Sequence, residues 1–401
     1  MRVETIEVGG DEAIARVAAV LAACSVGTEV MLTLPVVAWC PAVATPLVAL
    51  ADHYRRLGVR VTFDVPDGGA GASAVAGFLR ERLSPPEEGL SFSPFDRVWR
   101  FSTYDELNVL VNALVLQTGK SARLGKGVKE ALFWCFNEVM DNVLTHAAPD
   151  GRAQGYVMTS FLAREQRLKV CVFDLGIGLK ASFAPSRYQP ADDYEAIITA
   201  LKANVTSGIG QGNGLWGLHE LIRRAEGGSL SLASGAAEYL FSPKDGVDGP
   251  VAYAALPGFA GTTRVDFRLA LGGEISFASV FPGADAPVDL WQEAHETDDQ
   301  TVRFNVVEVA GGSGTRPSAA ALRHLVENVI ANDGKSVTLD FAGAAFCSSA
   351  FVDELVGKLL LAYGFVGFTQ RIRLVNVQGL AAQLINHSIA QRMADLSRGG
   401  A

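Results

Sequence analysis

Apolar residues in the first 90 positions alternate between short continuous runs and helical spacing. The runs at 29–39 and 59–66 predict strands, whereas the spacing at 44–58 and 75–83 predicts helices. The stretch 84–94 contains prolines and polar residues without apolar periodicity, so we interpret it as a linker. Residues 1–90 are therefore expected to form a small α/β domain.

The middle of the chain, about 96–275, has a different order of elements. Helices are predicted at 103–117, 124–147 and 214–227, and strands at 155–163, 167–176, 229–234, about 250–256 and 264–270. A loop of about thirty residues, rich in Gly, Asp, Pro and Ser, separates the second strand from the third helix. Helices beside an antiparallel sheet predict an α/β sandwich, with the loop as a lid or a disordered insertion.

A polar, acidic connection at 276–300 precedes a third domain, 301–401, where α/β alternation returns. Strands are predicted at 303–310, 336–346 and 371–377, and helices at 318–334 and 349–364. The segments 30–50 and 337–357 share a strand, a short turn at a cysteine and a helix. The two ends of the chain are therefore expected to be related in fold.

The composition and charge of the chain exclude several classes of protein. The chain of 401 residues carries a formal net charge of −9, which argues against nucleic acid as its main partner. No apolar stretch reaches the roughly 18 residues of a membrane span, and acidic residues stand where a signal peptide would be basic and apolar. The five scattered cysteines predict free thiols, and the histidines lack metal-ligand spacing. We expect a cytoplasmic multidomain protein without a membrane segment.

The helix around 131–147 carries polar residues in register on an apolar background. Glu138, Asn142 and His146 are spaced by four and so share one face. Three glycine-bearing stretches follow in order, at 173–183, 207–221 and 259–269. Glycines let backbone N–H groups approach phosphate, and a helix N-terminus adds a favourable dipole. Each stretch alone is a weak signal; their fixed order behind the polar helix predicts a nucleotide site.

With these motifs the middle domain resembles the GHKL ATPase domain (Bergerat fold) of gyrase, heat-shock chaperones and histidine kinases. Within that group it most resembles the anti-sigma factor serine kinases, whose helix also reads Glu-x-x-x-Asn-x-x-x-His. The resemblance implies that Glu138 is the catalytic general base and that Asn142 ligates the Mg²⁺ of bound ATP. The remaining cofactor-binding residues that it implies are His146, Asp174, Gly176, Gly178, Gly212, Asn213, Gly214, Leu215, Gly217, Thr262 and Thr263.

Of these residues, Asp174 would accept a hydrogen bond from the adenine amino group, and the glycines after 210 would surround the phosphates. His146 could equally serve only to interact favourably with the helix dipole at the C-terminal end of its helix. The sequence departs from many relatives at Asn213 and Trp216, where they have small residues. A large indole at Trp216 is expected to reshape the hinge of the lid.

The C-terminal domain resembles the STAS domains that accompany such kinases, through the stretch "VTLDFAGAAFCSSAFVDELVGKLL". The resemblance places Ser349 at the phosphoacceptor position with Ser348 beside it, although Cys347 replaces the usual aspartate. A serine here also fits an ordinary helix N-cap. The corresponding turn of the N-terminal domain, at Cys40, offers no hydroxyl, so a STAS-like copy there would have a binding or structural role.

These features lead to one main hypothesis and two alternatives. The main one is an ATP- and Mg²⁺-binding regulatory protein, an anti-sigma-type serine kinase and partner switch flanked by STAS-like domains. Its partners would be a sigma factor or a STAS protein. The alternatives are a homodimerising ATPase clamp and a non-catalytic protein in which ATP only orders the lid. A sensor histidine kinase is disfavoured because residues 54–145 contain no histidine.

Overall fold

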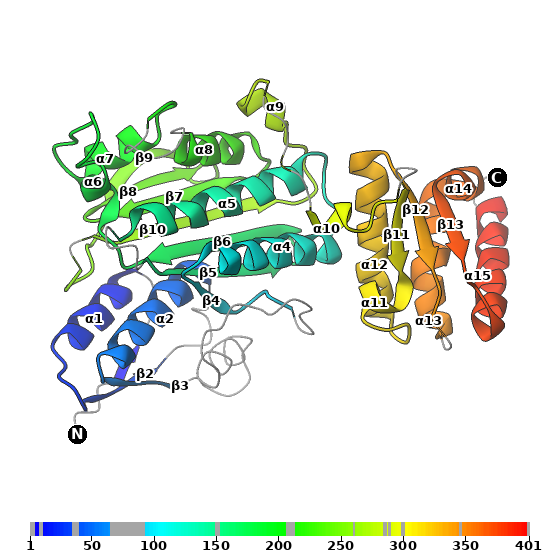
Figure 1. Ribbon diagram of the computed structural model, residues 1–401, viewed down its shortest axis with the longest axis horizontal. Helices are drawn as coiled ribbons and strands as arrows, with labels where there is room; N and C mark the ends of the chain where they lie inside the picture. Colours follow the sequence, from blue (N-terminus) through cyan, green and yellow to red (C-terminus); the bar gives the residue numbers. More distant parts are fainter. Residues whose placement is uncertain are drawn as a thin grey trace. The chain divides into compact units, whose positions relative to one another are not determined.

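The computed structural model describes most of the chain and divides it into two compact units (Figure 1). The described residues are 5–7, 11–33, 40–64, 93–148, 153–205, 213–259, 261–283, 287, 290–297, 301–344 and 347–398. Unit 1 comprises residues 1–114, 131–270 and 277–285, and unit 2 comprises residues 115–130, 271–276 and 286–401. No helix in these described ranges is long and apolar enough to cross a membrane.

Unit 1 begins with a small parallel sheet in the order β1-β2-β3. Its elements are β1 (Thr5–Glu7), α1 (Asp11–Ala22), β2 (Glu29–Thr33), α2 (Pro41–Arg56) and β3 (Arg60–Asp64). Pro41 stands at the first helical position of α2, where its missing N–H costs nothing. Leu47, Val48 and Leu50 are almost completely buried, so α2 is covered on more than one side.

The larger sheet of unit 1 is antiparallel, with seven strands in the order β4-β5-β6-β10-β7-β8-β9. These strands are β4 (Val98–Phe101), β5 (Gly155–Leu162), β6 (Arg167–Asp174), β7 (Ser229–Ser234), β8 (Ala237–Ser242), β9 (Val247–Ala252) and β10 (Thr263–Ala270). Strand β10, late in the sequence, pairs with both β6 and β7 and so closes the middle of the sheet. The sequence predicted every strand of this sheet except β4 and β8.

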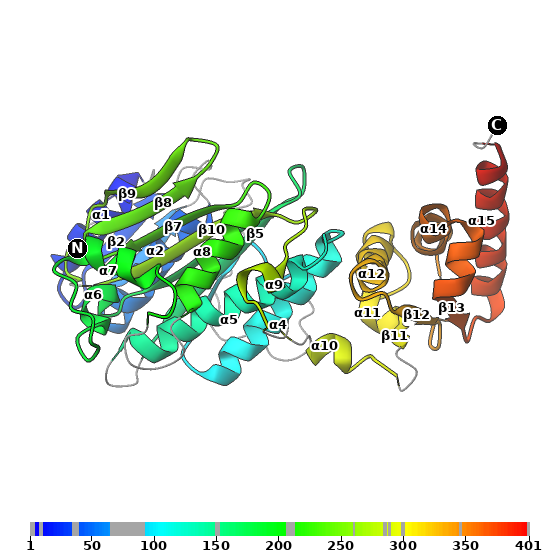
Figure 2. The same cartoon turned by 90° about the horizontal axis from the view of Figure 1, so that it is seen from above.

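Helices cover both faces of the large sheet (Figure 2). On β6, Phe173 joins a buried cluster with α2, whereas its neighbour Val172 faces the side that carries α5 (Val128–His146). This alternation follows from the pleat of a strand. The ring of Phe136 on α5 lies 6.2 Å from that of Phe267 on β10, which anchors α5 on its face. Helix α4 (Tyr104–Ser121) precedes α5 in the chain.

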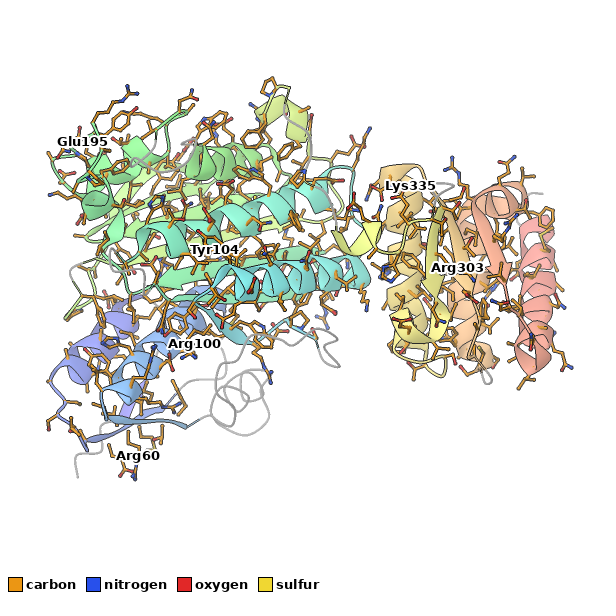
Figure 3. The ribbon with its side chains drawn as sticks, viewed as in Figure 1. Arg60, Arg100, Tyr104, Glu195, Arg303 and Lys335 are labelled. Atoms are coloured by element: carbon orange, nitrogen blue, oxygen red, sulfur yellow. The ribbon has the colours of Figure 1, made fainter. Side chains whose placement is uncertain are left out.

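A polar network fixes α2 against the sheet within unit 1. The Asp52 carboxylate accepts a hydrogen bond of 2.7 Å from the Tyr156 hydroxyl on β5. Arg100 on β4, labelled in Figure 3, lies 3.4 Å from the same carboxylate. The small N-terminal sheet therefore shares its core and a buried polar contact with the large sheet. The expected helix at 75–83 and the expected linker through residue 92 lie outside the described residues.

The segment between β6 and the next long helix contains two short helices where the sequence predicted a loop. They are α6 (Gly178–Ser182) and α7 (Asp193–Ala200), followed at residue 214 by α8 (Gly214–Arg224). Phe183 and Ala196 are buried together and pack against Leu215 of α8. Asp192 caps α7 by accepting a hydrogen bond from the Glu195 N–H. This apolar contact, spread over distant positions, leaves no periodic signal in the sequence.

Unit 2 contains a second parallel sheet, in the order β11-β12-β13. Its elements are α10 (Leu290–Glu293), β11 (Thr301–Asn305), α11 (Val306–Ala310), α12 (Arg316–Asn328), η1 (Val329–Asp333), β12 (Ser336–Asp340), α13 (Ser349–Val352), η2 (Asp353–Gly357), α14 (Lys358–Arg371), β13 (Ile372–Val375) and α15 (Gly379–Arg398). The strand predicted at 303–310 ends at Asn305, because the Asn305 side chain caps α11. The π-helical turns η1 and η2 are widened segments of the kind often found at functional sites.

Candidate functional site

The predicted polar face of α5 borders a cavity in unit 1. Asn142 and His146 line this cavity, together with the apolar residues Val139 and Val143. The other faces of α5 bury Phe136 and Met140 against the sheet. A helix fixed by its apolar side thus presents its polar residues to a hollow above the sheet.

Five elements close this cavity, whose volume is about 50 Å³. The residues singled out by the sequence that line it are Asn142, His146, Asp174, Gly178, Leu215 and Thr263. They come from α5, the C-terminal end of β6, α6, the first turn of α8 and the start of β10. Residues up to 121 positions apart, from Asn142 to Thr263, therefore meet at one place.

Asp174 is the buried acid of the cavity. It ends β6 opposite Thr263 of β10, and its Oδ1 accepts a hydrogen bond of 2.8 Å from the Gly176 N–H. Burial raises the pKa of Asp174 to about 7, although hydrogen bonds from Gly176 and Thr263 act in the opposite direction. A carboxyl group held near half-ionisation inside a cavity can accept or donate a hydrogen bond to a ligand.

The start of α8 approaches the polar face of α5. A Cβ atom added at Gly214 would lie 2.6 Å from Glu138 Oε2 and 3.4 Å from Asn142 Nδ2. Glycine at this position therefore lets the N-terminus of the helix come this close without displacing the Glu138 carboxylate. Burial, with a smaller contribution from the Asp141 carboxylate, raises the pKa of Glu138. Glu138 thus stands beside the positive end of the α8 dipole.

Asn142 carries an unsatisfied donor at this place. Within the described part of the chain, its buried Nδ2 has no hydrogen-bond partner. An unpaired buried amide costs free energy, so a ligand that accepts its hydrogen bond would bind favourably. His146, one turn further on, has its pKa lowered by burial, against the opposing effect of Asp141. This shift favours the neutral form of the imidazole.

The other predicted residues in the described part of the chain do not line the cavity. Asn213 is the N-cap position of α8, and its Oδ1 accepts a hydrogen bond of 3.0 Å from the Asn204 N–H. Thr262 is buried, and its carbonyl accepts a hydrogen bond of 3.3 Å from Gly235 N–H. Gly217 is buried beside two aromatic rings, described below. Gly212 lies outside the described residues.

Some residues that shape the cavity were not singled out by the sequence analysis. Leu179 and Ser182 on α6 line it, and Ser234 at the end of β7 accepts a hydrogen bond of 2.9 Å from the Leu179 N–H. A spacing of four between Gly178 and Ser182 was the available signal for a helical turn. No sequence pattern singles out Ser234, because only strand pairing brings it to the start of α6.

In unit 2 the turn before α13 holds the predicted phosphoacceptor. Ser348 is the N-cap of α13, since its Oγ accepts a hydrogen bond of 3.0 Å from the Phe351 N–H. Ser349, the first helical residue, is exposed, and Cys347 is buried. The Ser348 N–H donates a hydrogen bond of 3.1 Å to the Ser313 carbonyl, which ties the turn to the loop before α12. The two serines thus differ in both contacts and exposure.

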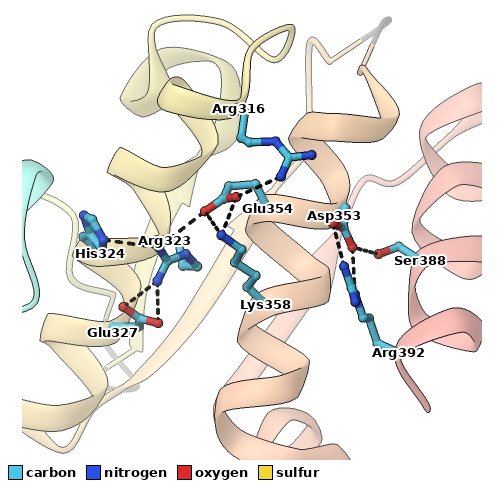
Figure 4. A network of polar contacts seen from close by, with 9 residues as sticks. All are labelled: Arg316, Arg323, His324, Glu327, Asp353, Glu354, Lys358, Ser388 and Arg392. Atoms are coloured by element: carbon cyan, nitrogen blue, oxygen red, sulfur yellow. Dashed lines mark hydrogen bonds and ion pairs between the residues drawn. The ribbon is translucent and has the colours of Figure 1, made fainter. Parts of the chain in front are cut away.

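A partly buried ion-pair network follows this turn (Figure 4). Glu354 is only 3% exposed and lies 3.4 Å from Arg323 of α12 and 2.7 Å from Lys358. Asp353 pairs with Arg392 of α15 at 2.8 Å, and this contact lowers the pKa of Asp353. The widened turn η2 thereby directs two consecutive acids to two different helices. The network fixes η2 between α12 and α15.

Comparison with known proteins identifies one domain. Residues 318–379 match the family model of a STAS-like domain of unknown function (DUF4325). The match extends from α12 to the first residue of α15 and includes Ser348 and Ser349. No curated protein matches the chain. The protein is therefore a mixed α/β protein of several sheets with a STAS-like domain near its C-terminus.

Proposed function

We propose that unit 1 contains an ATP- and Mg²⁺-binding site of the GHKL type and that the protein acts as a serine kinase and partner switch of the anti-sigma type. One observation carries this proposal. Residues in the order expected for that family line a single cavity, namely Asn142, His146, Asp174, Gly178, Leu215 and Thr263. The proposed domains are STAS-like at 1–90, GHKL at 96–275, a linker at 276–300 and STAS-like at 301–401.

The acidic end of the cavity suits a purine base. The Asp174 carboxylate can accept a hydrogen bond from an exocyclic amino group, and Thr263 lies beside it. Val172 and Val265 give the cavity apolar walls against which a planar ring can pack. A volume of about 50 Å³ holds a few water-sized groups, so the cavity takes part of a base rather than a whole nucleotide.

The region between α5 and α8 suits phosphates and a metal ion. Asn142 has an unpaired amide nitrogen for a phosphate oxygen, and its carbonyl oxygen is a suitable ligand for Mg²⁺. The N–H groups at the start of α8 would add donors. Bound Mg²⁺ would neutralise charge that develops on the transferred phosphoryl group. Glu138, whose pKa burial raises, would accept the proton of the attacking hydroxyl or water.

Ser349 is the proposed phosphoacceptor of the STAS-like domain. It is exposed, whereas the hydroxyl of Ser348 is occupied as the helix cap. A phosphoryl group at the start of a helix is favoured by the dipole. The acceptor is either Ser349 of the same chain or a serine of a separate partner, such as a STAS protein. A sigma factor would be the partner released or bound by the switch.

The deciding experiment is an incubation with Mg²⁺ and γ-labelled ATP in which protein-bound label and free phosphate are read together. Variants Glu138→Gln, Ser349→Ala and Ser348→Ala are compared with Glu165→Gln, which alters an exposed acid on the β5–β6 turn. Label lost with Glu138→Gln and Ser349→Ala but kept with Ser348→Ala supports phosphorylation within the chain.

Other outcomes select the alternatives. Free phosphate without label, lost only with Glu138→Gln, indicates the dimerising ATPase clamp. Tight ATP binding without turnover indicates a nucleotide-gated interaction protein. No measurable affinity for ATP would refute the proposal.

A further inference from the structure

An aromatic cluster lies behind the start of α8 in unit 1. Phe281 follows the short helix α9 (Phe277–Val280), and its ring centroid is 4.7 Å from that of Trp134 on α5. The same ring meets Trp216 of α8 edge-on, at 5.9 Å and 86°. Trp134 stands one turn before Glu138 on the same face of α5. Phe281 therefore joins the two helices that form the proposed phosphate site.

Gly217 explains why Phe281 fits there. A Cβ atom at Gly217 would collide with the rings of both Phe281 and Trp134. The absence of a side chain creates the space that Phe281 fills, and Trp216 forms its wall. Trp216 and Gly217 thus both shape the space that the Phe281 ring occupies.

A second contact holds the same segment at the other end of α8. Arg224 donates hydrogen bonds to the carbonyl and hydroxyl oxygens of Ser279, at 3.2 Å and 3.1 Å. Residues 277–281 are thus fixed on α8 from its last turn to its first. Figure 1 shows α9 beside α8.

We propose that Phe281 is a positioning residue that holds the start of α8 against α5 and thereby sets the position of Gly214 beside Glu138 and Asn142. It acts through α8 and has no contact with the cavity in the described structure. The consequence for nucleotide affinity rests on the proposed function of unit 1. The expected effect of Phe281 on the order of α8 does not depend on that proposed function.

The test is hydrogen exchange of the full-length chain without nucleotide, with Phe281→Ala, Phe281→Leu and Phe281→Tyr. Phe281→Ala is expected to accelerate exchange of the first hydrogen-bonded amides of α8, from Gly217 N–H onward, about tenfold, because the ring contacts that hold this end of the helix are lost. Phe281→Leu should give an intermediate increase, and Phe281→Tyr, which keeps the ring, little change. Phe259→Ala is the matched control, since Phe259 packs on His53 and Tyr54 of α2.

Exchange of the β6 amides reports whether a variant remains folded. If these amides lose protection in Phe281→Ala, the comparison is made with Phe281→Leu instead. Unchanged exchange at the start of α8 in both variants would overturn the inference. ATP titrations on the same samples form a second arm, in which Phe281→Ala is expected to weaken binding about tenfold. A wild-type protein that binds no ATP refutes the proposed function, while the exchange data still decide the role of Phe281.

Discussion

Replacement of Asp174 by Asn separates the stability of unit 1 from its proposed activity. The carboxyl group is 4% exposed, and its pKa is raised from 3.8 to about 7 mainly by burial. Asn has nearly the same shape, keeps an oxygen for the Gly176 N–H and never ionises. The variant should therefore be at least as stable as the wild type at pH 8, although it removes an acid from the cavity.

The sign of the effect follows from proton linkage. Between pH 3.8 and 7 the folded wild type holds a proton on Asp174 that the unfolded chain has lost, so the free energy of unfolding falls as the pH rises. Each pKa unit corresponds to about 1.4 kcal/mol, so the full loss approaches about 4 kcal/mol above pH 7. Asp174→Asn has no such loss. Its advantage should be small near pH 4 and reach up to about 4 kcal/mol by pH 8.

Urea unfolding at several pH values between 5 and 8.5, followed by a probe in unit 1, measures this difference. An Asn variant that is less stable at pH 8, or a difference that does not grow with pH, would refute the reasoning. ATP titration provides the functional half of the prediction. Because an amino group donates to the ionised carboxylate, wild-type affinity for ATP should increase from pH 6 to pH 8, and Asp174→Asn should remove this dependence.

Three further predictions concern unit 2, each measured as a change in the free energy of unfolding. Asn328→Ala should cost about 2–4 kcal/mol, because Asn328 bonds the Gly119 and Ala122 carbonyls and the Leu124 N–H. Asn332 donates a hydrogen bond of 3.4 Å to the Leu124 carbonyl, so a larger cost for Asn332→Ala would contradict this assignment. Glu354→Ala should cost about 1.5–3 kcal/mol, because a buried carboxylate that bonds Arg323 and Lys358 is lost while Arg323 keeps its pair with Glu327. An effect under about 1 kcal/mol would count against the network. Ser348→Ala should cost about 1 kcal/mol, because the N-cap hydrogen bond to the Phe351 N–H is lost. Ser349→Ala should cost less, and a larger cost for Ser349→Ala would exclude Ser348 as the N-cap.

Periodic elements were predictable from the sequence because one local pattern determines each of them. Helix α5 and strands β5, β6 and β10 occur within a few residues of their predicted bounds. Strand β8 was not predicted, although its apolar residues include the buried Tyr239 and Phe241; its pairing with β7 and β9 makes it a strand. The π-helical turns η1 and η2 were also beyond reach, since Gly357 approaches Asp353 and Ser388 only in the folded unit.

The candidate site was predictable to the extent that its residues carry their own chemical signal. Asn142, Asp174 and Thr263 stand out as polar groups at the ends or on the faces of apolar elements, and the cavity brings them together. Phe281 has no such signal, because an aromatic residue in a connection gains meaning only when Gly217 opens a space for it. Its role follows from tertiary packing alone.

The two ends of the chain were expected to share a fold, and each forms a three-stranded parallel sheet whose strands lie in sequence order. Their middle strands lead into very different helix starts. Helix α2 begins at Cys40 and Pro41, without a hydroxyl, and is buried along most of its length beside β5 and β6. Helix α13 begins at the exposed Ser349, after its N-cap Ser348. A kinase or partner can reach a hydroxyl only at the second start. The N-terminal sheet therefore completes the core of unit 1, and the exposed serine hydroxyl lies within the matched STAS-like domain at 318–379.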